Sequence, residues 1–332
     1  MIPEAGFILV DKPAGVTSFD VVNRVRRSLV DAFPELAPSR RSGSRRGRGP
    51  KPPRFKCGHA GTLDPLATGL LMVLVGKGSR LSPFLLGLDK TYLATVRFGT
   101  ATDSLDADGE VTATAALPES PSVIENVLPG FRGAIDQVPP LISALKRDGQ
   151  ALHKRVRAGE DVAEPEARPV TIHRLVMDAA RWEGVVPEGD LTVACSSGTY
   201  IRSLARDLAE AAGSVAHIAA LRRTEVGPFA VDDAVVGVME MPGEDLIASL
   251  RPAADALPWA PAMELTVDEA DFLRSGGQPG DDWLDRLKEK PVTQGKSSAI
   301  FRMLDTDGGL VAVGRIAESG LPRTALVMAG KG

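Results

Sequence analysis

Cysteine is nearly absent from this chain of 332 residues. Only Cys57 and Cys195 occur, and they do not form a CxxC pair. Two isolated cysteines exclude a disulfide framework and a zinc knuckle, so we expect both to be small buried hydrophobic side chains. The four histidines are too dispersed for HExxH or HxxxH ligation. The sequence therefore predicts no metal site.

Long apolar runs are also missing. The longest are LLMVLVG at 70–76 and TALVM at 324–328. Both fall far short of the roughly 20 residues that cross a bilayer. The N-terminus lacks the basic and then apolar pattern of a secretion signal. We therefore expect a cytoplasmic protein without membrane partners.

The motifs of two large enzyme classes are absent. The stretch VGKGS around Lys77 is similar to a phosphate loop, but Leu71 stands where its first glycine belongs, and Gly78 where Ser or Thr belongs. No GxSxG elbow is present for a serine nucleophile. The remaining candidates for chemistry are carboxylates, guanidinium groups and the only two tyrosines, Tyr92 and Tyr200.

The net charge of −4 hides a strong asymmetry along the chain. Residues 39–56 contain six Arg, two Lys and no acid, which gives +8 and leaves −12 for the rest. The stretch 230–285 has thirteen acids against Arg251 and Arg274. A basic segment rich in Gly, Ser and Pro is typical of a flexible loop that binds a polyanion, because Lys and Arg displace counterions from phosphates. It is equally typical of a solvated insertion, and both interpretations stay open.

Strand-like and helix-like segments mix without a strict βαβ rhythm. The runs with the composition or alternation of strands are 6–10, 70–76, 90–99 and 191–198. The runs with apolar residues at helical spacing are 17–33 and 199–213. This mixture predicts an α+β fold class rather than a doubly wound sheet.

A change of composition divides the chain near its end, at a Pro- and Ala-rich connector over 241–262. We predict a first domain over 1–250, with a flexible insertion at about 34–56 that contains five prolines. A second, small domain is predicted over 262–330. It is expected to be β-rich, because the residues at 307–309 are typical of a hairpin turn.

Five sequence blocks carry a family resemblance. They are VDKPAGVTSFDVV, CGHAGTLDPLATGLLMVLVGKGSRL, KTYLATVRFGTATDSLDADGE, VPPLISALKRDGQALHKRVRAG and CSSGTYIRSLARDLAE, and they cover most of residues 5–229. Together they resemble the TruB family of tRNA pseudouridine synthases. The resemblance implies the pseudouridine synthase fold, which is a mixed, mostly antiparallel central sheet with flanking helices. It also implies, more weakly, a PUA-like RNA-binding domain at the C-terminus.

The resemblance implies an activity as well. The family isomerises uridine 55 in the T loop of tRNA to pseudouridine, using no metal and no cofactor. The uridine is stacked inside folded RNA, so it must be flipped into the active site before it reacts. The implied partner is the T arm of tRNA, and the implied oligomeric state is a monomer.

Three residues match catalytic positions of the family. Asp64, in a turn between Gly61 and Pro65, matches the catalytic aspartate. This carboxylate either attacks C1′ of the ribose or abstracts the C2′ proton, and both routes stay open. Tyr92 matches the tyrosine that stacks on the target base and helps to remove the C5 proton. Arg202 matches the arginine that pairs with the catalytic aspartate.

The other matched residues concern the substrate. His59 matches a histidine that assists in extracting the nucleotide, and Tyr200 matches a pocket tyrosine. Asp106 matches an active-site acid expected to hydrogen-bond to base or sugar, although turn formation alone would explain an Asp in DADG. The candidates for phosphate contacts are Lys12, Arg80, Lys90 and Lys146.

Two alternatives to a tRNA isomerase stay open. One is a tRNA-folding or RNA-binding module that acts mainly without catalysis, although such a module would not need Asp64, Tyr92 and Arg202 together. The other is the same chemistry on different RNA stem-loops.

Two departures from the family concern RNA contact. Ile142 stands where the family usually has an aromatic residue, and the acidic start of the C-terminal domain would repel phosphates.

Overall fold

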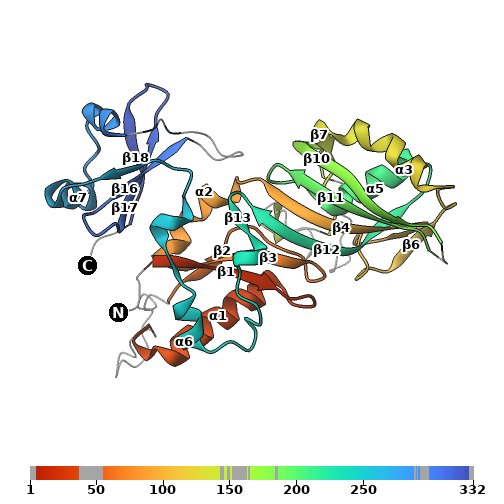
Figure 1. The fold of residues 1–332 in the computed structure, drawn as a ribbon, viewed down its shortest axis with the longest axis horizontal. Helices are drawn as coiled ribbons and strands as arrows, with labels where there is room; N and C mark the ends of the chain where they lie inside the picture. Colours follow the sequence, from red (N-terminus) through yellow and green to blue (C-terminus); the bar gives the residue numbers. More distant parts are fainter. Residues whose placement is uncertain are drawn as a thin grey trace. The chain divides into compact units, whose positions relative to one another are not determined.

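The computed structural model describes residues 5–36, 55–142, 146–147, 150–151, 163, 165–183, 186–287, 289, 291 and 299–328. The chain divides into two compact units, and Figure 1 labels their helices and strands. The first unit comprises Met1–Pro65, Gly69–Leu88 and Gly227–Gly332. The second unit comprises Leu66–Thr68 and Asp89–Val226.

The core of the first unit is built on two apolar strands. Strand β1 (Ala5–Lys12) pairs antiparallel with β3 (Thr68–Gly76), and its other edge pairs with the short β14 (Arg251–Pro252). Strand β2 (Cys57–His59) pairs with β3. Both long strands are buried at successive positions, as expected for apolar runs covered on both faces.

Helix α1 (Ser18–Ala32) follows β1 and packs near β2 and α6 (Gly243–Ala248). It begins at a capping box, in which Thr17 and Asp20 satisfy each other's backbone N–H groups. Val21, Val25 and Leu29 form its buried stripe. The other short elements of this part are η1 (Pro34–Leu36), η2 (Lys77–Leu81), α2 (Ser82–Leu86), β13 (Phe229–Ala230), η4 (Val231–Asp233) and η5 (Ala253–Ala256).

The second unit is a run of antiparallel strands with helix α5 (Ile201–Ala211) packed against β12 and β4. The strand order is β12 (Ala216–Val226), β4 (Lys90–Phe98), β11 (Glu188–Cys195), β10 (Arg168–Arg181) and β7 (Gly133–Gln137). The shorter elements are β5 (Thr100–Thr102), β6 (Val111–Thr114), α3 (Pro121–Val127), η3 (Leu128–Phe131), β8 (Lys146–Arg147) and β9 (Gln150–Ala151).

Strand β4 shows why this sheet has one buried and one polar face. Its residues at every second position from Lys90 to Phe98 are buried, and the residues between them are more exposed. On the polar face, Arg97 pairs with Glu188 at 2.7 Å, and Arg181 reaches Glu188 and Asp190. These guanidinium groups lower the pKa of the Glu188 and Asp190 carboxyls, so both stay charged at neutral pH.

The C-terminal segment has its own four-stranded sheet. The order is β15 (Ala262–Glu264), β16 (Ile300–Leu304), β17 (Leu310–Ile316) and β18 (Pro322–Val327), with β15 and β16 parallel. Helix α7 (Val267–Arg274) and η6 (Asp281–Arg286) contribute Leu273 and Trp283 to a small core around Phe301. The predicted hairpin joins β16 and β17. This segment belongs to the first compact unit, and the boundary at 250–262 stays a prediction.

The predicted fold class is confirmed: the chain has a large, mostly antiparallel sheet and few helices. The strands predicted at 6–10, 70–76, 90–99 and 191–198 are β1, β3, β4 and β11, and the helices predicted at 17–33 and 199–213 are α1 and α5. Of the insertion at 34–56, Pro34–Leu36 forms a 3₁₀ turn, and residues 37–54 lie outside the described residues. In the part of the chain that the structure describes, no helix is long and apolar enough to cross a membrane.

Candidate active site

The carboxylate of Asp64 is carried by a loop that is fixed on its N-terminal side. Asp64 is half-buried and lies between β2 and β3, after the buried Leu63. The hydroxyl of Ser18, the first residue of α1, accepts a hydrogen bond from Leu63 N–H at 2.8 Å and donates one to Leu63 C=O at 3.0 Å. One buried side chain therefore satisfies both backbone groups of the residue before Asp64.

The loop is fixed on its C-terminal side as well. The carbonyl of Pro65 accepts from Gly15 N–H at 2.9 Å and from Lys12 Nζ at 3.2 Å. Gly15 has a φ of +80°, which glycine adopts without steric cost and which lets the turn after β1 face Pro65. The segment from Lys12 to Ser18 thus holds the loop from both sides, and Asp64 is presented on a rigid backbone.

Lys12 does not fit the phosphate contact that we expected for it. The side chain has no exposed surface. Its Nζ donates to the carbonyls of Pro13 at 2.8 Å, Val16 at 2.7 Å and Pro65 at 3.2 Å. These bonds use the three donors of an ammonium group, so Lys12 is a buried support of the Asp64 loop.

We expect Lys12→Met to lower the free energy of unfolding by about 1–3 kcal/mol, because Met fills the volume but cannot donate to the partly buried carbonyls that Lys12 binds. Turnover falls as the Asp64 loop loosens. The slope of log affinity for RNA against log salt stays unchanged, whereas loss of a phosphate contact would reduce it by about one. Urea unfolding and a salt series of binding measure both. The exposed Lys56 provides the control Lys56→Met, with little effect on stability.

In the second unit, Asp106 and Arg202 form a buried ion pair. Each residue is only 5% exposed, and Nη1 of Arg202 lies 3.5 Å from Oδ2 of Asp106. The same Nη1 donates to the carbonyl of Ser104, and Nη2 donates to the carbonyl of Ile142 at 3.1 Å. Asp106 is therefore more than a turn residue. The pairing of Arg202 with Asp64, which the family resemblance implies, stays a prediction.

Strand β4 and helix α5 position the two tyrosines. Tyr92 is buried on β4, opposite Val193 of β11 and Arg223 of β12. Tyr200 is the N-cap residue of α5. Its N–H donates to Oε1 of Gln137 at 2.8 Å, and Nε2 of Gln137 donates back to the Tyr200 carbonyl at 3.1 Å. Gln137 thus fixes the start of the helix that carries Arg202.

The other predicted phosphate contacts have different surroundings. Lys90, the first residue of β4, is only 8% exposed, and its phosphate contact stays a prediction. Arg80 is exposed in η2, and its Nη1 donates to the carbonyl of Val327 in β18. Lys146 begins β8, and His59 is the half-buried last residue of β2. Arg80, Lys90, Lys146 and His59 stay candidates for RNA contact.

Three positioning residues were missed at the level of sequence: Ser18, Ser104 and Gln137. The position of Ser18 beside Thr17, at the start of a helix, indicated a role in capping but gave no indication of its contact with the Asp64 loop. Ser104 lies two residues before Asp106 and donates to its Oδ1. Gln137 had no signal, because its partner is the backbone of a residue far away in the sequence.

Neither cysteine has the character of a nucleophile. Burial raises the pKa of the Cys57 thiol to about 11 and that of the Cys195 thiol to about 11. Both are therefore protonated at neutral pH, where only a thiolate would be reactive.

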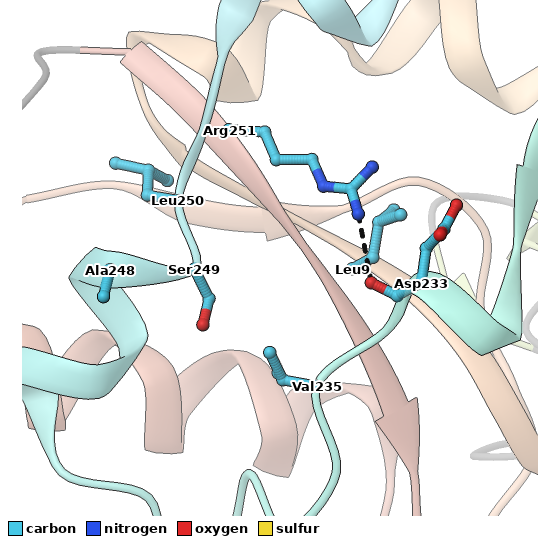
Figure 2. Close-up of a pocket in the computed structure, with 7 residues that line it drawn as sticks. All are labelled: Leu9, Asp233, Val235, Ala248, Ser249, Leu250 and Arg251. Atoms are coloured by element: carbon cyan, nitrogen blue, oxygen red, sulfur yellow. Dashed lines mark hydrogen bonds between the residues drawn. The ribbon is translucent and has the colours of Figure 1, made fainter.

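A separate pocket of about 280 Å³ in the first unit contains none of the predicted site residues (Figure 2). Its walls come from Leu9, Val235 and the segment from Ala248 to Arg251. Its polar groups bond to the protein: Arg251 Nη2 donates to Asp233 C=O at 3.1 Å, and Ser249 Oγ donates to Asp245 C=O at 2.9 Å. The pocket contains a carboxylate, Asp233, and a guanidinium group, Arg251, but neither belongs to the residues that match the family motifs.

Two family models match the chain. Residues 49–201 match the N-terminal domain of the TruB family of pseudouridylate synthases. Residues 202–243 match the C-terminal domain of tRNA pseudouridylate synthase B. The second match begins at Arg202, within α5, and ends before β15. It therefore does not describe the four-stranded sheet at the C-terminus, whose PUA-like character stays a prediction.

Similar proteins were found by sequence and by structure. The tRNA pseudouridine synthase B of Arthrobacter sp. (strain FB24) is 44% identical over 82% of this chain and 81% of the relative. That of Saccharophagus degradans is 37% identical over 96% of this chain and 94% of the relative. The crystal structure of a Cbf5-Nop10-Gar1 complex contains a chain with a TM-score of 0.64, 23% identical, covering 98% of this chain and 85% of that chain. This last likeness concerns the fold.

Proposed function

The chain belongs to the TruB family of pseudouridylate synthases, and from that premise we propose that it isomerises uridine 55 in the T loop of tRNA to pseudouridine. It is a pseudouridine synthase, an isomerase that acts on tRNA. The observation that supports a catalytic role is the loop of Asp64, whose neighbours Leu63 and Pro65 are bound on both sides by Lys12, Gly15 and Ser18. Such rigidity suits a carboxylate that must meet a reacting atom.

The reaction breaks the N1–C1′ bond, forms a C5–C1′ bond, moves a proton to N1 and releases the proton of C5. Asp64 supplies the carboxylate, either as the nucleophile at C1′ or as the base at C2′. Tyr92, fixed in the middle of the sheet, stacks on the flipped base and assists the loss of the C5 proton. Asp106 and Tyr200 bind base and sugar, and His59 assists the extraction of the nucleotide.

Basic groups hold the RNA. Arg80, Lys90 and Lys146 are the candidates for phosphate contacts, and the basic segment 39–56 adds positive charge. The unpaired loop of the T arm is a suitable substrate, because proteins read single-stranded RNA by splaying out and stacking its bases. We place the reaction in a monomer, as the family resemblance implies, and in the cytoplasm, as expected from the sequence.

The test uses two T-arm RNAs that differ only in the position of one [5-³H]uridine, at 55 or at 54. We expect tritium release from the RNA labelled at 55 and none from the other, because only the converted uridine loses its C5 hydrogen. Release from an unrelated stem-loop at the same rate would favour the alternative of broader RNA substrates. Binding of both RNAs without any release would favour the tRNA-folding module.

A further inference from the structure

Leu105 has an unusual backbone conformation beside the buried ion pair. Its φ is +62°, and it is the only residue other than glycine with a positive φ in the described part of the chain. The left-handed region is unfavourable for a leucine, because its Cβ approaches the following carbonyl. Glycine adopts this region freely, and asparagine does so more readily than other residues. Surrounding contacts must therefore hold Leu105 there.

Hydrogen bonds fix the backbone on both sides of Leu105. Its N–H donates to Thr102 C=O at 3.2 Å and closes a turn. Its carbonyl accepts from Ile218 N–H at 3.0 Å, and Ala107 N–H donates to Ile218 C=O at 2.9 Å. Asp106 thereby forms a parallel bridge with Ile218 of β12. The left-handed residue lies where the chain leaves the turn and joins the sheet.

This reversal directs both neighbours of Leu105 toward Arg202. Nη1 of Arg202 donates to Ser104 C=O and lies 3.5 Å from Oδ2 of Asp106. Ser104 Oγ donates to Oδ1 of Asp106, which also accepts from Asp108 N–H at 3.2 Å. Gly109 leaves room for this hydroxyl, since an added Cβ would lie 2.3 Å from Ser104 Oγ.

We propose that Leu105 is a positioning residue: its left-handed backbone, and not its side chain, holds the Asp106 carboxylate on Arg202 for the isomerisation. The inference rests on the proposed function for its effect on turnover. Its effect on stability is independent of that function.

Two substitutions separate the backbone from the side chain. Leu105→Asn removes the apolar side chain but tolerates a positive φ, so kcat stays within about threefold of the wild type. Leu105→Val keeps an apolar side chain but strongly disfavours a positive φ. We expect it to lower kcat about 30- to 100-fold with little change in KM, and to lower Tm by about 2–4 °C. Glycine adopts a positive φ without steric restriction, so Leu105→Gly should have a kcat close to that of Leu105→Asn.

The matched control is Leu93, an exposed leucine in β4. The backbone of Leu93 is extended, so Leu93→Val should lower Tm less than Leu93→Asn does. This order is the reverse of the one expected at Leu105. A double variant provides a further test of the route. Once Asp106→Asn has removed the carboxylate, adding Leu105→Val costs about threefold or less, because the two act through one contact.

The outcomes are distinct. The inference is supported if the wild type releases tritium and if Leu105→Asn and Leu105→Gly have a higher kcat and Tm than Leu105→Val. The inference is overturned if Leu105→Val has a higher kcat and Tm than Leu105→Asn. It is also overturned if the effects of Leu105→Val and Asp106→Asn on kcat are fully additive. If the wild type releases no tritium, the proposed function fails, whereas the order of the Tm values still tests the backbone of Leu105. A Val variant that does not fold leaves Asn and Gly as the test, and a large loss of kcat in both contradicts the inference.

Discussion

Asp64→Asn is expected to reduce tritium release from the T arm by at least about a thousandfold, because an amide can neither attack C1′ nor abstract the C2′ proton. Asn has nearly the same shape as Asp. Hydrogen bonds to the backbone of Leu63 and Pro65 hold the loop on both sides of this position, and the substitution leaves these bonds in place. The loop therefore keeps its conformation, and tRNA binding stays close to that of the wild type.

The measurement is single-turnover release at saturating RNA, with binding and thermal unfolding recorded for the same preparations. Asp31→Asn is the control, since Asp31 is an exposed carboxylate of α1 in the same compact unit and loses the same charge. It should release tritium at the rate of the wild type. Release by Asp64→Asn within tenfold of the wild type would mean that another group supplies the catalytic step.

Short-range patterns predicted the elements that carry the candidate site. The alternation from Tyr92 to Phe98 indicated a half-buried strand, and β4 has this burial. The helical spacing behind Thr17 indicated α1, and Thr17 is its N-cap. These predictions succeeded because both the periodicity and the cap depend on residues only a few positions apart.

The supports of the site could not be predicted in the same way. Lys12 bonds to Pro65 across 53 residues, and Gln137 bonds to Tyr200 across 63. In each case the partner is a backbone group, which every residue type possesses, so the sequence of the partner gives no signal. A lysine at the end of a strand is most often exposed, and the burial of Lys12 depends on three carbonyls that only the folded chain brings together.

The second large effect is expected at Arg202. Replacing it by Met should lower the free energy of unfolding by about 3–5 kcal/mol, because the carboxylate of Asp106 would remain buried without its cation. The carbonyls of Ser104 and Ile142 would lose donors as well. Urea unfolding measures the change, and tritium release should fall with it. Arg202→Lys keeps the charge but cannot bond these partners with two separate nitrogens. It should therefore recover only part of the stability and part of the tritium release.

Arg206, one turn later on α5, provides the matched control. Its Nη2 donates to Val138 C=O at 3.1 Å and its Nε donates to Asp207, but it is more exposed than Arg202. Arg206→Met should therefore cost about 1 kcal/mol. A loss as large as that of Arg202→Met would show that α5 needs its arginines for packing and not for the buried pair.

A double variant separates the ion pair from the packing around it. If the cost of Arg202→Met comes from an isolated buried carboxylate, then combining it with Asp106→Asn should be less destabilising than the sum of the two single variants, by about 1–3 kcal/mol. The neutral amide of Asn can still accept from Ser104 Oγ, so the loop around Leu105 keeps part of its support. Turnover should not recover, because the guanidinium that holds Ser104 and Ile142 is still missing. Recovery of stability without recovery of activity would therefore assign Arg202 two roles, neutralising Asp106 in the fold and directing donors within the candidate site. Additive losses of stability would contradict the pairing.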